Sequence, residues 1–137
     1  IFQYRTHAAE NSLYNTPPTF GVYLLRNVLS VVKAKGGLAA MEQHNRAKAG
    51  MLYGAIDARP DFYRCPVERE SRSFMNVVFN LPTPELEAEF ISESQKRGMV
   101  GLKGHRSVGG VRASIYNAAE MSWIEGLVAF MNEFKRA

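Results

Sequence analysis

The chain has 137 residues, of which 46% are hydrophobic and 11% aromatic, a composition that favours one soluble globular domain with its own core. No apolar run is long enough to cross a bilayer, so we expect no membrane partner. The net charge of +4 invites a nucleic-acid-binding interpretation, but the basic residues are scattered and no such motif accompanies them, so we expect no nucleic-acid partner.

The first half of the chain predicts a loop followed by two helices. Residues 1–16 are polar and lack periodicity, which is typical of a loop. Thr16 and Pro17 predict a helix start, because a hydroxyl caps the helix and proline suits its first position. Apolar residues at helical spacing continue to the pair Gly36–Gly37, and a second helix is predicted over 38–56. Its apolar face carries Met41, Met51, Leu52 and Ile56, and its polar face carries His44, Arg46 and Lys48.

The second half predicts short strands between helices. Strands are predicted at residues 73–80, 99–102 and 111–116. Thr83 and Pro84 open a helix that Gly98 closes, and Asn117 with Glu120 forms a capping-box pattern before the final helix. The fold class is therefore α/β of the α+β type, with a small mixed or antiparallel sheet covered by helices and preceded by a long helix pair.

Some residues limit the cell compartment and the chemistry. Cys65 is the single cysteine, so it cannot form an internal disulfide, which fits a cytoplasmic protein. We expect its thiol to be structural and inert. The chain begins with Ile1 and no signal-peptide pattern follows, so we expect a fragment or a processed product. The histidines lack the spacing of metal ligands, so no metal site is expected; they are His7, His44 and His105.

A basic motif, GHRSVGGVRASIYN, occupies residues 104–117. Arginine presents a planar fork of donors that matches carboxylate or phosphate oxygens in pairs. Arg106 in a loop and Arg112 entering a strand suit a ligand with two separate anionic groups. The alternative is a solvated basic turn beside an edge strand, and composition leaves both interpretations open. His105 and Ser107 lack a nearby acid and a nucleophile elbow, which argues against a hydrolase.

This motif and a second one, ENSLYNTPPTF at residues 10–20, resemble segments of the phosphoserine aminotransferases, pyridoxal-phosphate enzymes of the fold-type I group. The resemblance continues through Gly36-Gly37-Leu38 and covers essentially the whole chain. It implies roughly the last third of such an enzyme, its C-terminal portion. Residues 1–16 would form an active-site and dimer-interface loop, 17–57 a helical connector, and 58–137 a small C-terminal α/β domain.

The resemblance also implies an activity. A homodimeric parent enzyme would transfer an amino group between L-glutamate and 3-phosphohydroxypyruvate, giving O-phospho-L-serine and 2-oxoglutarate in serine biosynthesis and, in many bacteria, serving pyridoxine biosynthesis. Its cofactor would be pyridoxal 5'-phosphate. The lysine that carries the cofactor, the ring that stacks on it and its aspartate partner would lie upstream of this chain. We therefore expect no catalytic residue in this chain and no activity from it alone.

The resemblance assigns binding roles residue by residue. Arg112 would bind the substrate α-carboxylate, and His105 and Arg106 would contact the substrate phosphate. Asn15 and Thr16 would reach across the dimer to the cofactor phosphate of the other subunit. Two alternatives remain open: a phosphometabolite-binding domain without catalysis, and a basic nucleic-acid-binding module.

Overall fold

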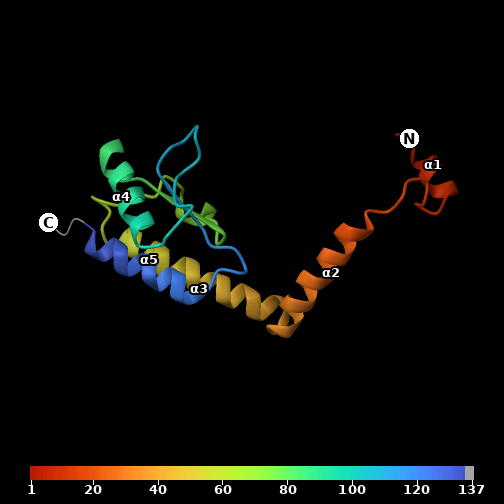
Figure 1. The fold of residues 1–137 in the computed structure, drawn as a ribbon, viewed down its shortest axis with the longest axis horizontal. Coiled ribbons are helices and arrows are strands. Elements are labelled where there is room, and N and C mark those ends of the chain that lie inside the picture. The colour runs from red at the N-terminus through yellow and green to blue at the C-terminus, as the bar shows by residue number, and fades with distance from the viewer. Residues whose placement is uncertain (135–137) are drawn as a thin grey trace. The chain divides into compact units, whose positions relative to one another are not determined.

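The computed structural model describes residues 1–134 of the chain (Figure 1). These residues divide into two units, Ile1–Ala39 and the part that begins at Ala40. The first unit opens with α1 (Tyr4–Ala9), a short helix inside the segment 1–16 that we expected to be irregular. None of the residues of α1 is buried, which agrees with its sequence, YRTHAA, where no apolar periodicity marks a helix.

The second helix, α2 (Thr19–Ala34), begins two residues later than the sequence predicts. The cause is the double proline: Pro18 disfavours helical backbone at Pro17, so the helix cannot start there. Thr16 is therefore not the helix cap. The Thr19 hydroxyl instead donates to the carbonyl oxygen of Pro17 at 3.3 Å.

The third helix, α3 (Gly37–Asp57), agrees with the predicted second helix to within one residue at each end. Three residues of the predicted apolar face are buried, namely Met41, Leu52 and Ile56. Met51 is exposed, so its assignment to that face was wrong.

Lys48 on α3 is fully buried, whereas its sequence position predicted a polar face. Its ammonium group donates to the carbonyl oxygens of Ile115, Tyr116 and Ala119 at 3.1, 2.7 and 2.9 Å. The prediction failed because these acceptors belong to a distant segment of the chain, which a helical pattern does not reveal. Lys48 thereby holds the turn that leads into the last helix.

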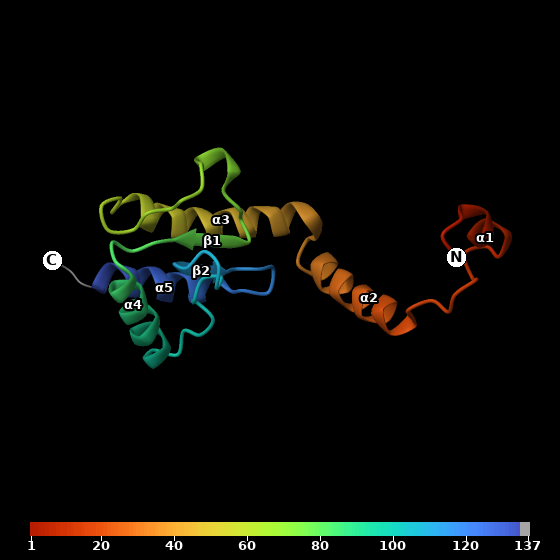
Figure 2. The ribbon, with the colours of Figure 1, turned by 90° about the horizontal axis from the view of Figure 1, so that it is seen from above.

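β1 (Asn76–Phe79) and β2 (Val111–Ser114) form an antiparallel two-stranded sheet, which confirms the small sheet and two of the three predicted strands (Figure 2). The register places Val78 opposite Arg112. Side chains alternate between the faces of a sheet, so one face is buried and Arg112 lies on the other. The buried face consists of Val77, Phe79, Val111 and Ala113.

The third predicted strand, at residues 99–102, is not formed. Gly101 has a φ of +80°, which is incompatible with extended backbone. The segment around Lys103 pairs with β2 only through an isolated antiparallel bridge between Lys103 and Val111 and through the hydrogen bonds that flank this bridge.

The helix α4 (Pro84–Lys96) confirms the predicted capping pattern. The Thr83 hydroxyl accepts a hydrogen bond from the Leu86 N–H at 3.3 Å. Gly98 follows the helix with a φ of +81°, a left-handed conformation that glycine adopts at little cost.

The last helix, α5 (Met121–Glu133), has Glu120 at its cap position and no side-chain cap. The predicted capping box is therefore wrong. Asn117 is engaged elsewhere, because its side-chain oxygen accepts a hydrogen bond from the amide of the buried Asn45 at 2.7 Å.

The core of the second unit lies between α3, α5 and the buried face of the sheet, with α4 beside them (Figures 1 and 2). A cluster of rings in edge-to-face or tilted contact fills its centre: Tyr63, Phe79, Phe90, Phe130 and Phe134. A single 3₁₀ turn, η1 (Arg69–Ser71), precedes β1. None of the helices within residues 1–134 is long and apolar enough to cross a bilayer.

Candidate anion-binding site

The basic motif forms a hairpin in the second unit. The N–H of Arg112 donates to the Leu102 carbonyl at 2.8 Å, and the N–H of Gly104 donates to the Gly110 carbonyl at 2.9 Å. The tip, residues 105–109, turns back through hydrogen bonds to the His105 carbonyl and projects from the fold (Figure 1). The hairpin thus joins a projecting basic loop to the start of β2.

Two glycines permit close approaches of the hairpin backbone, one between its own arms and one to the segment after β1. A Cβ atom on Gly104 would collide with the carbonyl oxygens of Gly109 and Gly110. Gly110 has a φ of +71°, and a Cβ atom there would lie 2.7 Å from the Asn80 side-chain nitrogen. The sequence does not reveal the constraint on Gly104, because it arises only once the hairpin is formed.

His105 at the loop tip is held in one ring orientation. The Ser107 N–H donates to His105 Nδ1 at 3.3 Å, which makes this nitrogen an acceptor. The Ser107 hydroxyl lies 2.6 Å from the same nitrogen and donates to it. In neutral His105 the ring proton is therefore on Nε2, where it can be donated to a phosphate oxygen.

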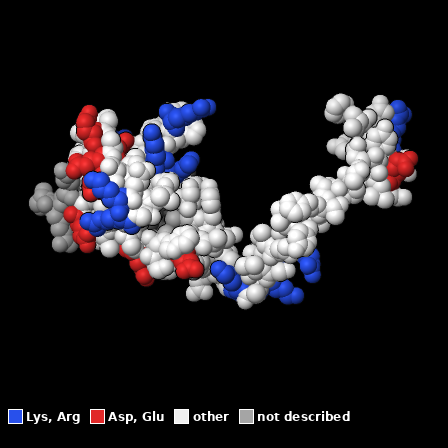
Figure 3. All heavy atoms as spheres, viewed as in Figure 1, with Lys and Arg blue, Asp and Glu red and all other residues white. Residues whose placement is uncertain are grey.

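Arg106 is exposed beside His105, and its side chain makes no hydrogen bond or ion pair within the described chain. Lys103 on the preceding arm is also exposed. Figure 3 shows basic side chains on the projecting loop. This tip therefore offers unpaired positive charge and several N–H donors to an anionic group.

Arg112, in β2, is the second basic group of the hairpin. It is half-buried, and its Nε atom is buried without a hydrogen-bond partner among residues 1–134. A buried donor left unsatisfied costs about 1–3 kcal/mol, and a bound carboxylate would supply the acceptor. No ion pair within residues 1–134 involves Arg112, so its guanidinium can accept an anionic partner.

Glu87 on α4 is a site residue that the sequence analysis missed. Its carboxylate accepts hydrogen bonds from the N–H of Gly110 at 3.1 Å and from the Asn80 amide at 2.9 Å. Glu87 also lies in the first turn of α4, where its charge complements the positive end of the helix. No local signal could have found it, because Gly110 is 23 residues away along the chain.

The structure brings together three of the five predicted site residues. His105, Arg106 and Arg112 share the hairpin, whereas Asn15 and Thr16 belong to the first unit. Asn15 and Thr16 are exposed in the segment that precedes α2. Their side chains carry an amide and a hydroxyl, both of which can donate to a phosphate.

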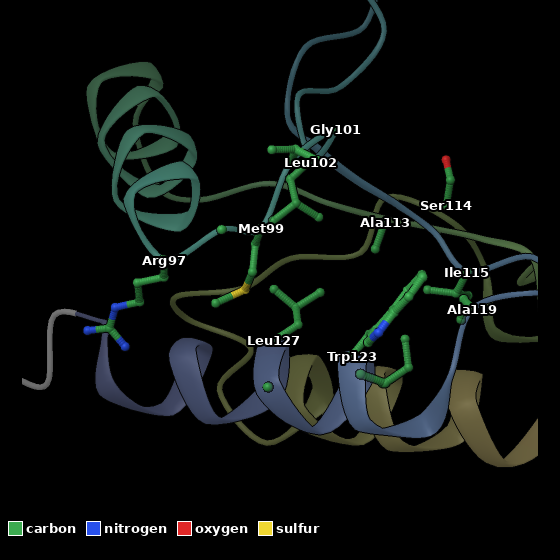
Figure 4. A pocket seen from close by; sticks show the side chains of 14 residues that line it. Arg97, Met99, Gly101, Leu102, Ala113, Ser114, Ile115, Ala119, Trp123 and Leu127 are labelled. Carbon is green, nitrogen blue, oxygen red and sulfur yellow. The ribbon is translucent and has the colours of Figure 1, made fainter.

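A cavity of about 570 Å³ lies next to the hairpin, between α5 and the segment after α4 (Figure 4). Apolar side chains dominate its lining, including Met99, Leu102, Ile115, Trp123 and Leu127. None of His105, Arg106 and Arg112 lines it. This cavity is therefore separate from the anion-binding hairpin.

Comparison with known proteins identifies relatives along nearly the whole chain. The family "Aminotransferase class-V" matches residues 1–127. Phosphoserine aminotransferase from Herpetosiphon aurantiacus is 56% identical over 134 residues, which are 98% of this chain and 37% of that protein. The protein of that name from Geobacillus kaustophilus is 56% identical over 136 residues, with 99% and 38% covered.

Solved structures agree with the described fold. Phosphoserine aminotransferase from Bacillus circulans subsp. alkalophilus has a TM-score of 0.88 and 53% identity, with 97% of this chain and 37% of that chain covered. The pyridoxal-phosphate-bound enzyme from Trichomonas vaginalis has a TM-score of 0.83 and 40% identity, with 95% and 37% covered. These structures confirm the expected fold class.

The chain spans 37–38% of the length of these two sequence relatives. This share agrees with the expectation that it is part of a longer enzyme. The expected C-terminal placement rests on the motifs alone, because the share of a relative's length that this chain covers does not say which part of the relative it matches. The family match covers both motifs and the helices between them. The chain therefore belongs to the class-V aminotransferase family.

Proposed function

We propose that this chain is part of a phosphoserine aminotransferase, which transfers an amino group between L-glutamate and 3-phosphohydroxypyruvate and yields O-phospho-L-serine and 2-oxoglutarate. One observation carries the proposal: the buried, unpartnered Nε of Arg112 shares a hairpin with the unpaired donors of His105 and Arg106. Two anion-binding groups set apart suit a substrate with a carboxylate and a phosphate. The names of the relatives support the same substrate.

Each basic group has a role in this proposal. Arg112 binds the α-carboxylate, because its strand position fixes the guanidinium more rigidly than a loop would. Arg106 and His105 bind the phosphate, since the exposed loop tip leaves room for a larger, more highly charged group. The chain thereby orients the substrate, and the rest of the enzyme performs the chemistry.

Pyridoxal phosphate is the proposed cofactor, and when bound it supplies an electron sink at the amino-acid α-carbon. The donor set of Asn15 and Thr16 fits its phosphate, because both side chains are exposed and carry N–H or O–H donors. Pro17 and Pro18 lack N–H groups, so these side chains would contribute more than the helix backbone. In a homodimer they would serve the cofactor of the partner subunit.

The lysine that carries the cofactor is proposed to lie outside this chain. Lys48 is unsuitable, because three carbonyl oxygens already accept from its ammonium group. Four further lysines are exposed to solvent: Lys33, Lys35, Lys96 and Lys103. Lys135 lies outside the described residues. The chain alone is therefore expected to be inactive.

The function is tested with the complete enzyme loaded with pyridoxal phosphate. Formation of 2-oxoglutarate from glutamate should require 3-phosphohydroxypyruvate. The proposed place of this reaction is serine biosynthesis in the cytoplasm. Phosphoserine binding without turnover would instead favour a phosphometabolite-binding domain. Binding to nucleic acid that falls steeply with salt, without phosphoserine competition, would favour the nucleic-acid-binding module.

A further inference from the structure

We propose that Glu87 is a positioning residue that fixes the spacing between the two anion-binding groups of the hairpin and so favours substrates with two anionic groups. The inference rests on the proposed function, because it takes the loop tip as the phosphate site and Arg112 as the carboxylate site. Glu87 itself contacts neither group of the substrate.

The first step of the argument is the set of bonds to the carboxylate. Glu87 Oε2 accepts from the Gly110 N–H at 3.1 Å. Glu87 Oε1 accepts from the Asn80 amide at 2.9 Å and from the Leu81 N–H at 3.3 Å. One side chain therefore joins the start of α4, the segment after β1 and the residue before β2.

The second step is the place of Gly110 in the hairpin. It lies between the tip, residues 105–109, and Arg112, so any rotation of its backbone moves one anion-binding group relative to the other. Its φ of +71° lies in the left-handed region, which glycine adopts about as readily as negative φ, so the backbone of Gly110 has more conformations open to it than that of other residues. A hydrogen bond from its N–H to the Glu87 carboxylate therefore restricts the backbone at the joint between the two anion-binding groups.

The third step is that the carboxylate is rigidly held. The backbone N–H of Glu87 donates to the Thr83 carbonyl at 3.1 Å within the capped first turn of α4. The side chain is half-buried, so water does not freely replace its partners. Supporting groups of this kind hold ligand-binding residues in their productive geometry.

A carboxylate suits this joint better than an amide. Three donors converge on Glu87, and a carboxylate can accept all of them on two oxygens. A glutamine has only one oxygen. In Glu87→Gln the NH₂ group must face either the Gly110 N–H or the donors of Asn80 and Leu81, so at least one bond is lost while the size of the side chain is kept.

Glu85 provides the matched control. It lies in the same first turn of α4 and carries the same charge, but it is exposed and makes no hydrogen bond to the hairpin. Glu85→Gln removes an equal charge from the helix start. A difference between the two variants therefore reports the hairpin contact and not the helix dipole.

The test uses the complete holoenzyme and three ligands. Glu87→Gln should raise KM for O-phospho-L-serine about ten-fold, the size expected from the loss of one hydrogen bond to a charged group, with kcat nearly unchanged. Inhibition constants for inorganic phosphate and for propionate should change less than about two-fold, because each probes one anion-binding group alone. Glu85→Gln should match the wild type in all three.

Asn80→Ala is the second variant, in case Glu87→Gln does not fold. It removes one donor from the Glu87 carboxylate and should raise the same KM by a smaller factor. Equal losses for phosphoserine, phosphate and propionate, or an unchanged KM in both variants, would overturn the role of Glu87. A wild-type enzyme that does not turn over phosphoserine would instead overturn the proposed function.

Discussion

Two arginines of the chain show how the environment of a guanidinium separates a structural role from a binding role. Arg72 and Arg112 each have a buried Nε without a partner. Arg72 nevertheless donates two hydrogen bonds to Asp57, at 2.8 and 2.9 Å, which lower the pKa of that carboxyl. Arg112 has no carboxylate partner within the described chain. Its charge therefore remains available for a ligand.

Arg112→Lys in the complete enzyme should weaken the reaction of both amino-acid substrates, because glutamate and phosphoserine share the α-carboxylate. Lysine keeps the charge but loses the two-pronged geometry, so we expect a loss of about 2–3 kcal/mol of transition-state stabilisation. Steady-state kcat/KM for each substrate measures it. Unchanged values for both would show that Arg112 does not bind the carboxylate.

Arg106→Ala should be selective. It should lower kcat/KM for phosphoserine more than for an unphosphorylated analogue, because only the phosphate contact is removed. Glutamate is a weaker control, since its side-chain carboxylate can use the same basic tip. If the phosphorylated and unphosphorylated substrates lose equally, Arg106 has a structural role instead.

At the scale of elements, Lys48 connects α3 to the turn before α5. Lys48→Met should lower the free energy of unfolding of the complete enzyme by about 2–3 kcal/mol, because three carbonyl oxygens lose a charged donor. Lys96→Met is the control, since Lys96 makes only an exposed ion pair with Glu93. Thermal and urea unfolding measure both variants, and equal stabilities would contradict the role of Lys48.

The elements that sequence analysis placed well are those with local causes. The cap at Thr83 and the apolar spacing of α3 are written within a few neighbouring residues. Arg106 and Arg112 were predicted as binding residues from signals of the same kind, because their chemistry and their flanking glycines are local, and their roles stay predictions. Residues with distant partners escaped: Lys48 was misplaced, and Glu87 was missed.

At the scale of the whole molecule, α2 is the feature that a single chain leaves unexplained. None of its residues is buried within the described chain. Apart from Val32, its large apolar side chains are at least 48% exposed. They are Phe20, Val22, Tyr23, Leu24, Leu25, Val28, Leu29 and Val31. Exposed apolar surface of this extent is typical of an interface.

We therefore expect the isolated chain to self-associate. Its weight-average mass in sedimentation should rise with concentration, and Leu25→Glu should shift it toward the monomer, whereas Ser30→Glu, which adds the same charge at a polar position, should do so less. A monomer at every concentration would show that α2 is covered by other means.

Substrate preference of the complete enzyme tests the two-anion hairpin most directly. The measurement is the ratio of kcat/KM for O-phospho-L-serine to that for L-serine, two substrates that differ only in the phosphate. Charge-assisted contacts from His105 and Arg106 should favour the phosphorylated substrate by about 100-fold or more. A ratio near one would contradict the assignment of the hairpin as the substrate-binding site.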